Sequence, residues 1–235
     1  MALTLAWIGS MYSKINESKK AIGYSEQSIQ MSRNLHGDDY RSDEIATRLS
    51  DIGAAYDRLG EHKKGIQYSE QSIQMRRDLH GDDYQTDGIA SCLGIIGLAY
   101  VKSGEHRKGI GYCERSNQMR RGLHGHDYQS DFIANNLNNI GLAYKNLGEP
   151  RKAINYFEQS IKMKQNLSGR DSQSDSIASS LRNIAFPYMS LGKHKKAIGY
   201  FKQYVKMKRA VHGREFKSSE LVEALEYISE EYEII

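Results

Sequence analysis

The string LHGDDY, at residues 35–40 and again at 79–84, places a histidine, a glycine and two carboxylates side by side. A third copy, LHGHDY at 123–128, adds a second histidine. Such side chains can transfer protons or bind a metal, but a metal site needs three or four ligands at one point. The string recurs along the chain, and its fourth copy, LSGRDS, lacks the histidine. The pattern therefore favours a structural role, with a metal or pH-sensitive site at His124, His126 and Asp127 as the alternative.

The remaining chemistry-bearing residues do not form a recognisable catalytic or cofactor motif. Cys92 and Cys113 are the two cysteines, which is too few for a disulfide framework or a paired-cysteine metal site. No nucleophile, base and orienting group can be placed together, and no phosphate-binding glycine loop is present. We therefore predict that the chain is not an enzyme and uses no cofactor or metal.

Charge and hydropathy argue against two classes of partner, nucleic acids and membranes. A formal net charge of +4 is weak for nucleic-acid binding. No stretch approaches the roughly 18 apolar residues of a membrane span. We predict a cytoplasmic protein whose partners are neither nucleic acid nor membrane.

Internal repetition explains most of the chain. Gly60, Gly104, Gly148 and Gly192 follow one another at intervals of 44 residues, and Asn16 extends the series backwards. The predicted repeats are residues 2–45, 46–89, 90–133, 134–177 and 178–221, followed by a partial or capping helix at 222–235. The chain starts and stops within this pattern, which suggests a segment of a longer protein or a trimmed array.

Each repeat has the pattern of a helical hairpin. Ile45, Leu49, Ile52 and Tyr56 fall on one face of a helix that Ser42 can cap. The glycine series ends the first helix of each pair, and the glycine of LHG ends the second. Pro150 opens a second helix, where its missing N–H does no harm. The fold class is therefore all-α.

The repeat resembles the tetratricopeptide repeat (TPR). Its pattern is met by Leu137, Ile140, Gly141 and Tyr144, followed by Ala153 and Phe157. The 44-residue period exceeds the usual 34, and this long form resembles the TPR arrays of kinesin light chain and nephrocystin-3. The resemblance implies a single array over residues 1–235, forming a right-handed superhelix (an α-solenoid) of five hairpins and a C-terminal helix. It also implies a protein–protein interaction scaffold that binds a peptide or protein segment in a concave groove lined by the first helices.

Candidate groove residues lie where equivalent positions of the first helices differ. We predict that the groove is lined by Leu98, Val101, Lys102, Asn135, Asn138, Asn139, Leu142, Lys145, Arg182, Asn183, Phe186 and Met189. Amides can hold the backbone of an extended peptide. Lys102, Lys145 and Arg182 favour acidic residues in that ligand.

A structural function is the alternative. The array would then be a spacer, or a self-association or autoinhibitory module that packs against other domains of its parent chain. Glu223, Glu226, Glu230, Glu231 and Glu233 predict either a solvated capping helix or an acidic end that orients a ligand or pairs with another copy. Pro187, inside a first helix, predicts a kink.

Overall fold

The computed structural model describes residues 1–169 and 174–234, with side chains described up to Ser229 in the last helix. These residues form eleven α-helices and no strand, which confirms the all-α prediction. The helices are α1 (Ala2–Lys14), α2 (Ser18–His36), α3 (Asp43–Arg58), α4 (His62–His80), α5 (Asp87–Lys102), α6 (His106–His124), α7 (Asp131–Asn146), α8 (Pro150–Ser168), α9 (Asp175–Ser190), α10 (His194–His212) and α11 (Ser219–Ile234).

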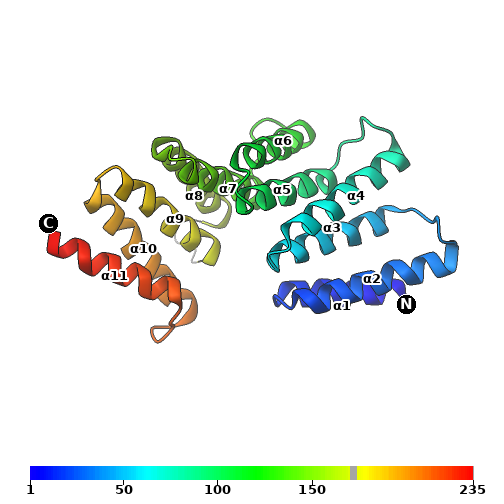
Figure 1. The fold of residues 1–235 in the computed structure, drawn as a ribbon, viewed down its shortest axis with the longest axis horizontal. Coiled ribbons are helices and arrows are strands. Elements are labelled where there is room, and N and C mark those ends of the chain that lie inside the picture. The colour runs from blue at the N-terminus through cyan, green and yellow to red at the C-terminus, as the bar shows by residue number, and fades with distance from the viewer. Residues whose placement is uncertain (170–173, 235) are drawn as a thin grey trace. The chain divides into compact units, whose positions relative to one another are not determined.

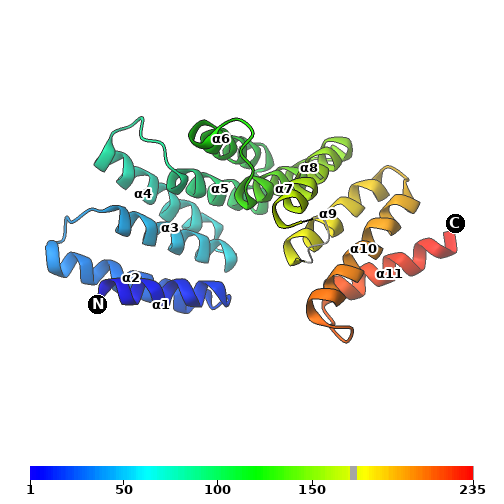
Figure 2. The same cartoon turned by 180° about the vertical axis from the view of Figure 1, so that it is seen from behind.

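The chain divides into two compact units. The first unit covers Met1–Tyr128 with helices α1 to α6, and the second covers Gln129–Ile235 with helices α7 to α11. Within each unit, each odd-numbered helix up to α9 packs against the helix that follows it as an antiparallel hairpin (Figures 1 and 2). The predicted single array over the whole chain stays a prediction.

Local sequence fixes both ends of the first helices. The hydroxyl of Ser42 accepts a hydrogen bond from the Ile45 amide at 3.2 Å, and this satisfies an amide that would otherwise lack a partner at the start of α3. Thr86, Ser130 and Ser174 cap α5, α7 and α9 in the same way. Asn16 adopts a positive φ of 60° at the position that the later repeats fill with glycine, as the repeat register predicts.

The two helices of a hairpin approach closely because a glycine of the first helix faces a buried side chain of the second. A Cβ added at Gly97 of α5 would lie 2.6 Å from the Cys113 sulfur of α6. One added at Gly141 of α7 would lie 2.8 Å from the Phe157 ring of α8. Both partner side chains are buried, so the glycine and the residue opposite it fill a shared space.

Each hairpin also carries a stacked tyrosine pair between its two helices. Ring centroids are 5.3 to 5.5 Å apart and the ring planes lie within 25° of parallel in all five pairs. The pairs are Tyr12–Tyr24, Tyr56–Tyr68, Tyr100–Tyr112, Tyr144–Tyr156 and Tyr188–Tyr200. Offset aromatic stacking of this kind favours one alignment of the paired helices.

The LHGDDY string lies at the end of the second helix. His80 Nε2 is 2.8 Å from the carboxylate of Asp43 at the start of the same hairpin, and the His80 ring lies 4.2 Å from that of Tyr84. His124 repeats both contacts with Asp87 and Tyr128. These contacts join the two ends of a hairpin, which is the structural role that the sequence pattern favours.

Pro187 lies inside α9 and is fully buried. The helix continues through it and ends at Ser190, so the proline does not divide α9 into two elements. The missing amide removes one hydrogen bond from a buried turn.

Candidate ligand-binding surface

Side chains from three successive first helices meet in the second unit. Lys145 comes from α7, Arg182 and Phe186 from α9, and Glu223 and Tyr227 from α11. We call these five residues the Arg182–Phe186 cluster. Three of them were predicted as groove residues from the sequence, and the structure brings those three together.

The Phe186 ring is the centre of this cluster. The Lys145 amine lies 5.3 Å from its centroid and the Arg182 guanidinium 5.2 Å, both within the range of cation–π attraction. Tyr227 contacts the same ring edge-on at 5.8 Å. Phe186 is only partly buried, so its face and the two cations form a surface rather than a core.

Two positively charged side chains lie close together on this surface. Burial lowers the pKa of Lys145, and the neighbouring positive charge of Arg182 lowers it further. Glu223 pairs with Arg182 and partly opposes the effect on Lys145. The Glu223 carboxylate thus pairs with Arg182 and lies near Lys145, and a second carboxylate would relieve the mutual repulsion of the two cations.

The predicted amides extend this surface along α7 and α9. The Asn183 amide donates to the Asn138 side-chain oxygen at 3.4 Å, and the Ser176 hydroxyl donates to that of Asn135 at 3.5 Å. Both contacts are long, and Asn135 is exposed. Asn139 is partly exposed on the same helix.

The other predicted residues lie in different surroundings. Leu142 and Met189 are partly buried against the core of the second unit. In the first unit, Leu98 is partly exposed, and the Lys102 amine pairs with Asp57 at 2.8 Å. Lys102 therefore already has a carboxylate partner within the chain.

Val101 does not lie on the surface. Its side chain is 1% exposed and lies over Gly109, where an added Cβ would come within 2.5 Å of a Val101 methyl group. Lys145 and Met189 stand at the same position of later repeats, opposite Ala153 and Ala197, and remain partly exposed. A glycine in the second helix makes room for the side chain, so we leave Val101 out of the proposed site.

The sequence analysis named Glu223 as part of a possible acidic end, but it did not predict that Glu223 pairs with Arg182 or that Tyr227 contacts Phe186. Glu223 follows Arg182 by 41 residues, and Lys102 follows its partner Asp57 by 45. Residues in contact across successive first helices are therefore separated in sequence by 44 residues, the repeat length, plus or minus one to three. A search of the sequence for oppositely charged residues at these separations would have predicted that Glu223 lies beside Arg182.

No group of three or more His, Cys, Asp or Glu side chains is arranged to hold a metal ion among the residues that the structure describes. In the same part of the chain, no helix is both long enough and apolar enough to span a membrane.

Comparison with protein families identifies the repeat. Two models described as tetratricopeptide repeat match the chain, one at residues 45–83 and the other at residues 88–166. The chain belongs to the tetratricopeptide repeat family. A TPR protein is in general a scaffold for protein–protein interaction, and its hairpins stack as a solenoid. No curated protein matches this TPR chain.

Solved structures share the fold at low sequence identity. BtubC (bklc) from P. vanneervenii has a TM-score of 0.71 and 17% identity, covering 92% of this chain and 83% of its own. The TPR-like repeats of a putative kinesin light chain from Podosopora anserina have a TM-score of 0.62 and 15% identity, covering 88% and 94%. A Rap protein complexed with competence and sporulation factor has a TM-score of 0.70 and 15% identity, covering 97% and 64%.

Proposed function

We propose that this TPR protein binds a peptide or protein segment at the Arg182–Phe186 cluster and acts as a non-catalytic interaction scaffold in the cytoplasm. The observation that carries the proposal is the position of Lys145 and Arg182 over the ring of the partly exposed Phe186. Cations held beside an aromatic surface can bind a segment that carries a carboxylate next to an apolar side chain. The structural neighbour complexed with competence and sporulation factor supports ligand binding by this fold.

The proposed mode of binding follows from the contacts already made. A ligand carboxylate would lie beside Lys145 and Arg182, in place of or next to Glu223. Asn135 and Asn138 would then hold the ligand backbone, because amide side chains both donate and accept hydrogen bonds. Preformed contacts between α7, α9 and α11 lower the cost of ordering the surface on binding.

A peptide-display selection on the full chain tests this function. The parent is compared with a Lys145→Met/Arg182→Glu variant, and Lys162→Met on α8 provides a matched control because that lysine is exposed and outside the cluster. We expect peptides rich in Asp and Glu to be enriched by the parent and the control and lost by the double variant.

Other outcomes have defined meanings. Peptides retained equally by all three proteins would place the binding surface elsewhere on the chain. No enrichment on any protein would contradict peptide binding and favour the alternative of a spacer or self-association module.

A further inference from the structure

The second helix of each hairpin covers one face of the first. Ala46, Ala90 and Ala134 lie on that face and are fully buried. Their backbone carbonyls accept hydrogen bonds of 2.6 to 2.7 Å from serine hydroxyls of the following helix. The repeat therefore defines a standard position for a helix against this face.

The corresponding face of α11 is exposed. Val222 follows Ala178 by one repeat, yet Val222 is 46% exposed where Ala178 is 0% exposed. Leu225 is 38% exposed, whereas its equivalent Leu181 is 3% exposed. Two large apolar side chains thus stand in solvent at the position that a helix covers in the other hairpins.

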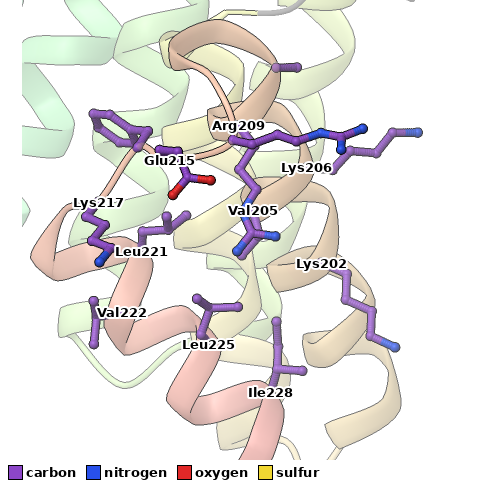
Figure 3. A pocket seen from close by; sticks show the side chains of 13 residues that line it. Lys202, Val205, Lys206, Arg209, Glu215, Lys217, Leu221, Val222, Leu225 and Ile228 are labelled. Atoms are coloured by element: carbon purple, nitrogen blue, oxygen red, sulfur yellow. The ribbon is translucent and has the colours of Figure 1, made fainter.

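A groove of about 990 Å³ runs between α10 and α11 beside this face. Figure 3 shows its apolar side chains on both helices, with Val205 on α10 and Leu221, Leu225 and Ile228 along α11. The groove therefore lies along a helix face, and an amphipathic helix can bury its apolar side in such a groove.

The rim of the groove is basic. Its cationic residues are Lys202, Lys206, Arg209, Arg214 and Lys217, and Glu215 is the carboxylate among the lining residues. Closely spaced cations beside an apolar floor favour an occupant with acidic side chains flanking its apolar face. The exposed helix α1 of a second copy does not fit this description, because α1 has no acidic residue and ends in Lys14.

We propose that the α10–α11 groove is a docking site for an amphipathic helix of a partner protein, with small and apolar residues on one face and Asp or Glu on its flanks. The helix takes the position against α11 that α8 takes against α7. The α10–α11 groove is a second interaction surface, since none of the groove residues belongs to the Arg182–Phe186 cluster.

Two peptides made from α8 test this proposal. The acidic probe has the α8 sequence, Pro150–Ser168, with the exposed residues Arg151, Lys152 and Lys162 replaced by Glu. The control is the unaltered α8 peptide, which has the same apolar face and the opposite charge. Binding to the full chain is followed by fluorescence anisotropy of labelled peptides.

We expect the acidic probe to bind the full chain at least about tenfold more tightly than the control peptide. Leu225→Glu and Val222→Glu should each weaken binding of the acidic probe about tenfold or more. Both side chains are exposed in the free chain, so both variants should fold as the parent does. Lys206→Glu should also weaken binding, while Lys195→Glu, on α10 but outside the groove, should not. Raising NaCl from about 50 to about 300 mM should reduce the affinity.

Three results would overturn the proposal. Equal binding of both peptides would remove the predicted preference for acidic flanks. Binding that survives both Leu225→Glu and Val222→Glu would place the probe outside the groove. A dimer in sedimentation analysis that Leu225→Glu dissociates would show that a second copy, not a partner helix, covers the groove.

Discussion

Replacing Lys164 with methionine removes a buried amine whose pKa the fold lowers from 10.5 to about 8. Lys164 lies on α8 and is 4% exposed. Its amine donates hydrogen bonds to the Ser176 carbonyl at 3.0 Å and to the Ser180 hydroxyl at 3.1 Å. Burial disfavours the charged amine, and the negative charge of Asp131 opposes this only in part.

The sign of the pH effect follows from the two protonation states. Between pH 8 and 10.5, Lys164 is largely neutral in the folded chain and still protonated in the unfolded chain. Since the unfolded state binds more protons there, the free energy of unfolding rises with pH across this window. The full difference between the two pKa values corresponds to about 3 kcal/mol. Below pH 8 both states are protonated, and this contribution no longer changes with pH.

Urea unfolding followed by circular dichroism measures the effect at about pH 7.5, 8.5, 9.5 and 10.5. The proteins are the parent, Lys164→Met and the exposed-site control Lys162→Met. We expect the parent to gain about 2–3 kcal/mol relative to Lys164→Met across the series, and Lys162→Met to follow the parent. Tyrosine and cysteine titrations are common to all three and cancel in the difference. A parent-to-variant difference constant within about 0.5 kcal/mol would refute the reasoning.

Four further substitutions test the packing and the charges. Gly109→Ala should lower the melting temperature in thermal unfolding, because the new Cβ would lie 2.5 Å from a methyl group of Val101 and 2.8 Å from the Gly97 carbonyl oxygen. Gly111→Ala on the same helix is the control: its new Cβ would meet nothing within 4 Å, so this substitution should stabilise the chain by up to about 1 kcal/mol. Pro187→Ala should raise stability by roughly 1–3 kcal/mol by restoring a helical hydrogen bond, and an unchanged melting temperature would show that α9 tolerates proline here without cost. Hydrogen bonds from Lys208 and then His212 lower the pKa of Asp175, so Asp175→Asn should reduce the loss of stability as pH falls through about 4, measured by acid titration.

The hairpins could be predicted from the sequence because their signals are local. A capping hydroxyl such as Ser42 and a positive-φ position such as Asn16 each act within one turn of chain, and the 44-residue spacing repeats them. The apolar stripes then determine which faces pack. These features depend on neighbouring residues alone, so a single sequence contains them in full.

The candidate site was predicted less completely because it depends on contacts between helices. Lys145, Arg182 and Phe186 were identified from their divergence between repeats. Glu223 was assigned to a capping helix or to an acidic end that orients a ligand or pairs with another copy, and its pairing with Arg182, 41 residues away, was not predicted. Val101 was misplaced because the space that it fills depends on Gly109 in the other helix of its hairpin. To predict where such side chains lie, one must know the distance between two helices and the rotation of each about its axis. The sequence of one helix alone determines neither.

The stacked tyrosine pairs give each hairpin an intrinsic spectroscopic probe. Two phenol rings about 5.4 Å apart and nearly parallel form a coupled chromophore in the near ultraviolet. Its circular dichroism depends on the alignment of the two helices and disappears when they separate. Replacing Tyr68 with phenylalanine would remove the coupled-tyrosine circular dichroism of the α3–α4 hairpin alone, and replacing Tyr156 would remove that of the α7–α8 hairpin. A set of such single replacements would therefore resolve the melting of this chain hairpin by hairpin, without any added dye.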